Sequence, residues 1–174
     1  MKTFSATHAA GNDWSDLCDR VVANSADAGD LAFIYLAEQL ANRGDQIIDR
    51  LRERTGIAHW VGCVGMGLCG TGTETYDQPA VSVLTTPFDK DSFRLIPSFE
   101  KTPTEWLATT RDWRQRSLAS VAVVHSDPSC NTLPEQLTTL SDDLGGGFLV
   151  GGIASAEKDA LQFVDAPASG GISG

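Results

Sequence analysis

Two glycine-rich stretches are the segments of this sequence best suited to hold a small ligand. The first contains Gly62, Cys63, Gly65 and Gly67. Glycine lets backbone N–H groups approach a ligand closely, because it adopts conformations that other residues cannot reach. The spacing is not G-x-G-x-x-G at the start of a helix, and no Lys-Ser or Lys-Thr pair follows as in a phosphate loop. The stretch therefore disfavours a nucleotide site and leaves two interpretations, a ligand-facing loop and a plain hairpin or bulged strand.

The second stretch contains Gly151, Gly152 and Ser155, and it occupies an equivalent place in the later half of the chain. Open α/β sheets usually bind small ligands in a crevice at the ends of their strands. We therefore expect the two stretches to flank one crevice, whose lining comes from both halves of the chain.

A third group, His125, Asp127 and Cys130, follows a predicted strand, from which loop side chains can point at a ligand. Such residues could hold zinc or support a thiol nucleophile with a histidine base. Their spacing matches no established set, and a turn capped by Asp127 is the simpler interpretation. We predict no metal and no cofactor, with His125 and Asp127 as polar groups at the rim. The alternative function is an enzyme with Cys63 or Cys130 as its nucleophile.

Helices and short apolar strands must position these residues. Apolar residues on one helical face predict helices over 12–24 and across Ile47, Ile48 and Leu51, the second ending at Gly56. Capping-box patterns at 102–105 and 132–135 predict two more. The predicted strands are 2–8, 31–36, 60–64, 80–84, 92–99, 121–124, 150–153 and 160–167.

Short apolar motifs recur with a period of about ninety residues. For example, 31–34 (LAFI) corresponds to 121–124 (VAVV). We predict an α/β fold with a mixed sheet and flanking helices, built from two pseudo-symmetric repeats, 1–91 and 92–167, that share one core in a single domain, 1–174. Residues 168–174 carry no closing element, which indicates a truncation point and a tail that is mobile or pairs with a neighbouring chain.

Composition limits the classes of function. The chain has 174 residues, of which 41 % are hydrophobic, as in an ordinary soluble domain. Its net charge of −10 would repel a phosphate backbone, so we expect no nucleic-acid partner. No apolar run approaches the ~20 residues that span a bilayer, so we expect a cytoplasmic protein with no membrane partner. The four cysteines indicate free thiols. A partner-docking scaffold would need only the acidic surface.

Seven motifs occur in a recognisable order: 28–36, 51–56, 61–63, 80–84, 125–128, 149–155 and 170–174. Together they resemble the N-terminal module of FIST domain proteins, a family of sensory modules. The resemblance implies an intracellular role in signal transduction, with a small-molecule ligand such as an amino acid or related metabolite. It also implies a companion C-terminal module and leaves the oligomeric state open. The run 64–68 (VGMGL) departs from the polar run usual in the family, which implies a more apolar pocket.

Overall fold

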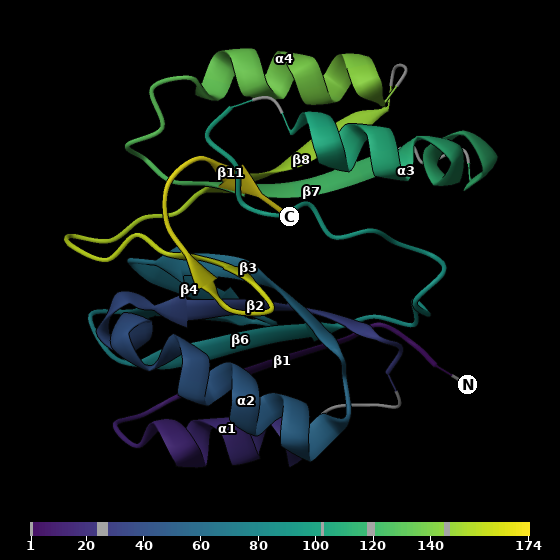
Figure 1. Cartoon of the computed structure of the whole chain (residues 1–174). Helices are drawn as coiled ribbons and strands as arrows, with labels where there is room; N and C mark the ends of the chain where they lie inside the picture. The colour runs from purple at the N-terminus through teal and green to yellow at the C-terminus, as the bar shows by residue number, and fades with distance from the viewer. Residues whose placement is uncertain (1, 24–27, 102, 118–120, 145–146) are drawn as a thin grey trace.

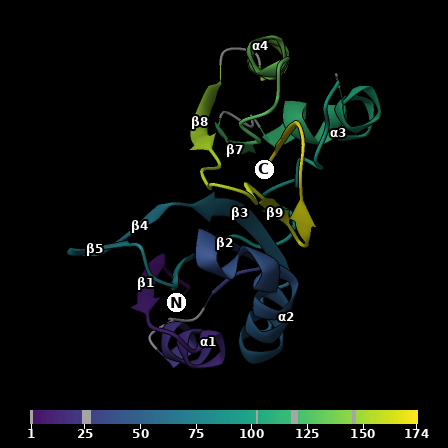
Figure 2. The ribbon, with the colours of Figure 1, turned by 90° about the vertical axis from the view of Figure 1, so that its left-hand side faces the viewer.

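Two sheets face each other in the computed structural model, and each carries helices on its outer side (Figure 1). The structure describes residues 2–23, 28–101, 103–117, 121–144 and 147–174. The view turned by 90° separates a larger layer, which holds α1 and α2, from a smaller layer with α3 and α4 (Figure 2). The predicted α/β class with mixed sheets and flanking helices is confirmed.

The larger sheet has six strands. Their order is β1 (Ser5–Ala10), β6 (Ala80–Thr85), β2 (Leu31–Ala37), β3 (His59–Gly65), β9 (Gln162–Val164) and β10 (Pro167–Ala168). Only β2 and β3 are parallel, and the 3-10 helix η1 (Glu38–Arg43) and α2 (Gly44–Thr55) connect them. With α1 (Trp14–Ala23), α2 covers one face of the sheet, because the apolar stripes of both helices are buried there. Gly56 ends α2 in the left-handed conformation.

The smaller sheet has three strands and its own helices. Its order is β11 (Ile172–Ser173), β7 (Val121–Ser126) and β8 (Phe148–Ile153), covered by α3 (Thr104–Ser117) and α4 (Leu133–Asp143). β7 and β8 are parallel. The predicted strand 121–124 is present, and its first residue, Val121, is 58 % exposed. A separate hairpin, β4 (Gly67–Gly70) and β5 (Thr73–Tyr76), follows β3.

The structure does not confirm two equivalent halves. The β2–β3 and β7–β8 pairs do correspond in register, with Ile34 opposite Gly62 and Val124 opposite Gly151. However, β9 and β10 join the larger sheet, because Phe163 is fully buried in the core of that layer. The predicted strand 92–99 is reduced to a single bridge at Phe99. Buried apolar residues form separate clusters in the two layers.

The closing segment, residues 168–174, forms backbone hydrogen bonds with other parts of the chain. Ile172 and Ser173 are fully buried, and β11 pairs with the end of β7. Ile96 and Gly174 exchange backbone hydrogen bonds of 2.6 and 3.0 Å. The expectation that 168–174 lacks a closing element is therefore wrong, since this segment forms β11 with backbone partners far away in sequence. Thr102, the first residue of the capping-box pattern at 102–105, lies outside the described residues.

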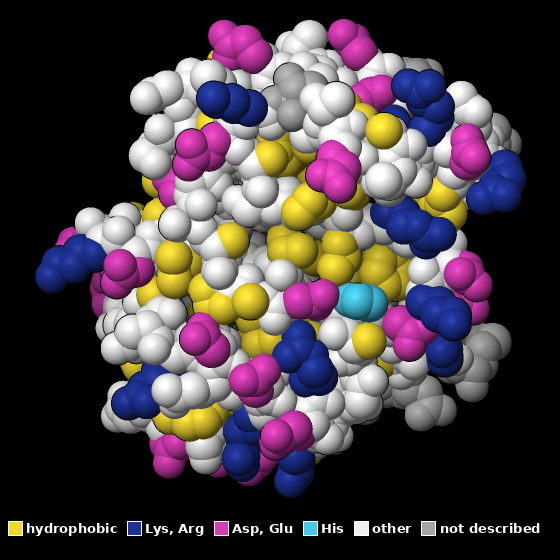
Figure 3. Space-filling view, viewed as in Figure 1, with side chains coloured by type: hydrophobic (Ala, Val, Ile, Leu, Met, Phe, Trp, Pro, Cys, Tyr) yellow, Lys and Arg dark blue, Asp and Glu magenta, His cyan; other side chains and the backbone are white. Residues whose placement is uncertain are grey.

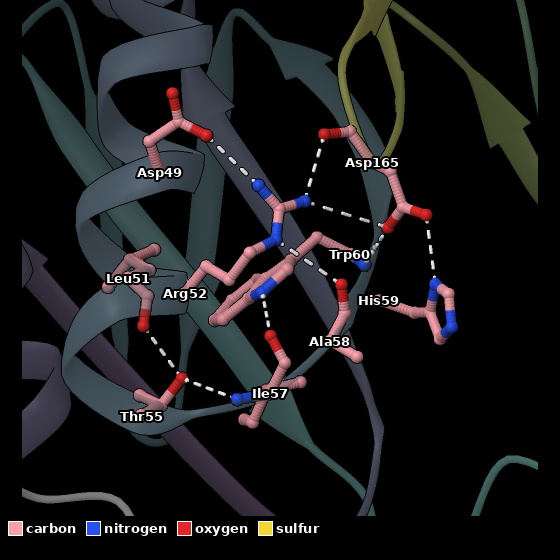
Figure 4. Close-up of polar contacts among 9 residues, drawn as sticks. All are labelled: Asp49, Leu51, Arg52, Thr55, Ile57, Ala58, His59, Trp60 and Asp165. Atoms are coloured by element: carbon pink, nitrogen blue, oxygen red, sulfur yellow. Dashed lines mark hydrogen bonds and ion pairs between the residues drawn. The ribbon is translucent and has the colours of Figure 1, made fainter.

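A polar cluster links the turn between β9 and β10 to β3 and to the end of α2 (Figure 4). The carboxylate of Asp165 accepts the backbone N–H of Trp60 at 2.9 Å and lies 2.9 Å from Nδ1 of His59. Arg52 donates to the backbone oxygen of Asp165 at 3.1 Å and pairs with Asp49 at 2.9 Å. Arg52, in the last turn of α2, therefore stabilises the fold itself, and its positive charge is also favourable at a helix C-terminus.

Candidate functional site

The carboxyl ends of β3 and β8 meet where the two layers approach each other. The backbone N–H of Ser155, just after β8, donates to the oxygen of Val64 at 3.1 Å. The hydroxyl oxygen of Ser155 accepts the N–H of Met66 at 3.2 Å. Two hydrogen bonds thus join segments that lie about ninety residues apart in the chain. One segment belongs to the first glycine-rich stretch and the other belongs to the second.

A cavity of about 320 Å³ lies at this junction, and we call it the strand-end cavity. It is lined by Tyr35, Cys63, Val64, Gly65, Gly67, Leu68, Cys69, Ser82, Ile153 and Ser155. Four of these, Cys63, Gly65, Gly67 and Ser155, were expected from the sequence to share a site. The described lining residues include no carboxylate, imidazole, ammonium or guanidinium group, so polar recognition there depends on hydroxyls, thiols and the backbone.

The other predicted site residues lie elsewhere. A Cβ atom on Gly62 would lie 1.7 Å from the carbonyl oxygen of Ile34, and one on Gly151 would lie 1.7 Å from that of Val124. These two glycines therefore allow close strand contact and do not face the cavity. Gly152 is exposed, with open space beside it.

Asp127 serves the local turn. Its carboxylate accepts the N–H of Ser129 at 2.7 Å and that of Gly170 at 2.7 Å. These bonds hold the pKa of Asp127 below its ordinary value, although partial burial acts in the opposite direction as the largest single influence. The simpler interpretation of this residue, a capped turn, is the one that the structure supports.

His125 lies behind the cavity wall, in contact with Tyr35. Its Nε2 is 3.2 Å from the Tyr35 hydroxyl, and the ring centroids are 5.5 Å apart. The side chain is buried, and its Nδ1 has no hydrogen-bond partner. Burial lowers the pKa of His125 to about 4 and raises the pKa of Tyr35, so both groups are neutral near pH 7. The pair supports the wall through an uncharged hydrogen bond.

The model of the FIST N domain family matches residues 30–174, which is most of the chain. The chain belongs to the FIST N domain family. The suspected resemblance is therefore confirmed, and FIST domains are sensory domains of signal transduction. Neither the curated proteins nor the solved structures contain a significant match to the chain. Within the described parts of this FIST domain, no helix is both long and apolar enough to cross a membrane.

Sequence reasoning missed several polar residues of this FIST domain. Ser82 lines the cavity from β6, and its hydroxyl lies 2.7 Å from Nδ1 of His8 and donates to the oxygen of Cys69 at 3.2 Å. The other nitrogen of His8 is 2.9 Å from the Thr75 hydroxyl. This network connects the β4–β5 hairpin to the larger sheet. A serine inside the apolar run 80–84 is the signal that could have revealed it.

The surroundings of Cys63 do not activate its thiol as a nucleophile. Burial raises the pKa of the Cys63 thiol to about 11, so the thiol stays protonated near neutral pH. Cys130 lies 3.4 Å from the side-chain oxygen of Gln136, in the turn before α4. Among the residues that the structure describes, no three His, Cys, Asp or Glu side chains are grouped to hold a metal ion.

Acid is expected to destabilise the FIST domain through His125. The unfolded histidine takes up a proton near pH 6.5, whereas the folded one does so near pH 4. Stability is therefore unaffected by this group above pH 6.5 and falls as the pH drops from 6.5 to 4, by up to about 3 kcal/mol. Urea unfolding at several pH values measures this effect. The free energy of unfolding should fall less steeply between pH 6.5 and pH 4 for His125→Phe than for the wild type.

The His8→Gln variant is the control for this experiment. Burial and the nearby Arg20 also lower the pKa of His8, but that side chain is only partly buried and has two hydroxyl partners. We expect His8→Gln to retain most of the acid dependence. An equal slope for wild type and His125→Phe would contradict the assignment to His125.

Proposed function

We propose that this FIST domain senses a small polar metabolite, of the amino-acid class, in the strand-end cavity. The observation that carries the proposal is the meeting of the two glycine-rich stretches, because Cys63, Gly65 and Gly67 line one cavity together with Ser155. Pockets of a few hundred Å³ with a few convergent polar groups are the usual form of a small-molecule site.

The chemistry of the lining favours a ligand without net charge. Tyr35, Ser82 and Ser155 supply hydroxyl groups, and Val64, Leu68 and Ile153 supply apolar surface. The lining offers no ion pair to a purely anionic or cationic ligand. A zwitterionic amino acid has no net charge, and hydroxyl and backbone groups can hydrogen-bond both of its ends.

Two wider aspects of the proposal come from the family. We infer a cytoplasmic domain that acts beside a companion C-terminal module. The edge strand β8 supports such a module, since Phe148, Val150 and Ile153 are 72, 50 and 57 % exposed. An exposed apolar strand edge is a favourable docking surface for another domain.

Replacing Gly65 by valine should weaken ligand binding strongly with a modest loss of stability. A Cβ atom at this position would lie 3.1 Å from the oxygen of Gly67 and 4.0 Å from the hydroxyl of Ser155, inside the cavity. We expect at least about a tenfold loss of affinity, against a loss of stability of about 1 kcal/mol. Thermal-shift screening against the twenty standard amino acids, followed by calorimetric titration of those that stabilise the wild type, measures both.

Gly152→Val is the matched control, because a Cβ at Gly152 meets nothing within 4 Å. This variant should bind as the wild type does. The proposal fails if no amino acid stabilises the wild type, or if Gly65→Val and Gly152→Val bind the same ligand equally well.

A further inference from the structure

A second and larger cavity lies between the two layers, and we call it the interlayer cavity. Its volume is about 470 Å³. Phe33 and Val61 line it from β2 and β3, two residues before Tyr35 and Cys63 of the strand-end cavity. The two cavities therefore occupy successive parts of the same strands. The space-filling view shows hydrophobic side chains gathered in the hollow between the layers (Figure 3).

Aromatic rings form much of the wall of the interlayer cavity. They are Phe33, Phe88, Phe93, Trp106 and Trp113. Both indole N–H groups already have partners, since Trp106 donates to the oxygen of Leu95 at 2.6 Å and Trp113 donates to that of Asp91 at 2.8 Å. The rings are thus held in place, and the surface that they offer to a ligand is apolar. Such a wall suits a flat aromatic group, which gains from stacked or edge-to-face contacts.

The charged side chains that line the interlayer cavity are both basic. Acidic residues outnumber basic ones by 23 to 13 in the whole chain, yet among the described residues that line the cavity the charged side chains are Arg94 and Arg114. Arg94 lies 4.7 Å over the ring of Trp113 and donates to the backbone oxygens of Lys90 and Phe93. These two lining side chains are therefore basic in a protein that is otherwise acidic, and this favours an anion beside them.

Arg114 is the more buried of the two guanidinium groups, with only 10 % of its side chain exposed. Its Nη1 donates to the backbone oxygen of Asp143 at 3.0 Å and lies 3.4 Å from that residue's carboxylate, and its Nη2 donates to the oxygen of Leu107 at 2.8 Å. Its Nε is buried and has no partner. A buried donor without an acceptor is costly, and a ligand oxygen could satisfy it.

We propose that the interlayer cavity binds a small aromatic carboxylate. The ring lies among the phenylalanine and tryptophan side chains, and the carboxylate binds the guanidinium groups of Arg94 and Arg114. This ligand class differs from that of the strand-end cavity, where the lining carries no charge. The FIST domain thus has two sites, one for an uncharged or zwitterionic metabolite and one for an apolar anion.

The test is calorimetric titration with indole-3-propionate, its amide and nonanoate. The acid should bind at least about tenfold more tightly than the amide, because a charge-assisted hydrogen bond is lost in the amide. It should also bind more tightly than nonanoate, an aliphatic acid. Equal binding of acid and amide would overturn the role of the arginines, and equal binding of the two acids would overturn the aromatic class.

Four variants assign the binding to this cavity. Arg114→Gln and Arg94→Gln should each weaken the acid about tenfold and leave the amide unchanged. Arg116→Gln removes the same charge from an exposed position of α3 outside the lining and should bind normally. If Arg114→Gln does not fold, Arg94→Gln decides, and equal effects of Arg94→Gln and Arg116→Gln would overturn the proposal. Gly65→Val should bind the acid as the wild type does, which separates this site from the strand-end cavity.

Discussion

Replacement of Gly62 by alanine is expected to prevent the larger sheet from forming. The added Cβ would lie 1.7 Å from the carbonyl oxygen of Ile34 and 2.7 Å from its carbonyl carbon. Both atoms belong to the backbone of β2, which is paired on both sides and cannot move aside. The φ angle of Gly62, +158°, adds strain for any other residue. A loss of more than about 4 kcal/mol in the free energy of unfolding is expected, as for other severe backbone clashes.

Urea unfolding followed by circular dichroism measures the effect against three other glycines. Gly152→Ala should change stability by less than about 0.5 kcal/mol, because its Cβ meets nothing. Gly56→Ala should cost about 1 kcal/mol, since Gly56 has a φ of +73° in open space. The loss of stability in Gly151→Ala should lie between the losses in Gly56→Ala and Gly62→Ala, because the edge strand β8 can shift away from Val124. A Gly62→Ala midpoint near that of the wild type would refute the argument.

Replacing Gln162 should weaken the attachment of the two layers to each other. Gln162 lies in β9 of the larger sheet and is fully buried. Its amide nitrogen donates to the oxygens of Gly170 and Gly171 at 3.2 and 3.3 Å, and its oxygen accepts the hydroxyl of Ser173 at 2.5 Å. Ser173 belongs to β11 of the smaller sheet and is also fully buried. This one side chain therefore makes three hydrogen bonds toward the closing segment.

Gln162→Met keeps the length of the side chain and removes these bonds. We expect a loss of about 3 kcal/mol, because the Ser173 hydroxyl remains buried without its acceptor. Hydrogen exchange should accelerate in β7 and β11 more than in β2 and β3, since the smaller layer loses a tie. Ser173→Ala is the partner variant, and the double variant should lose less than the sum of the two single ones. The role of Gln162 as a link would be contradicted if the stability losses of the two single variants added up to that of the double variant. It would also be contradicted if hydrogen exchange accelerated equally in both sheets.

Local patterns in the sequence determined most of the elements. The apolar stripe of α1 and the left-handed end of α2 at Gly56 appear where spacing and residue type predict them. The continuous apolar runs form β6, β2 and β3, which are neighbours in the middle of the larger sheet. Of these, β2 and β3 form its parallel pair. These features depend on contacts between near neighbours in the chain, which a single sequence records directly.

Part of the candidate site could also be predicted from the sequence. The glycine-rich stretches predicted that Cys63, Gly65, Gly67 and Ser155 come together, and the structure brings them to one cavity. The same glycines could not be sorted further from residue type. Gly62 and Gly65 differ in their surroundings, because Gly62 lies against the backbone of β2 and Gly65 lies beside a cavity. Only the pairing of the strands decides this difference.

Tertiary structure alone decided how the later half of the chain is divided between the layers. β9, β10 and β11 have only two or three residues each, too few to show a period of two. Their places depend on long-range contacts, namely Phe163 in the core of the larger layer and the backbone bonds of Gly174 with Ile96. The strand-end and interlayer cavities exist because these short segments hold two sheets face to face. Neither propensity nor spacing encodes such an arrangement, since each short strand is stabilised by partners far away in sequence.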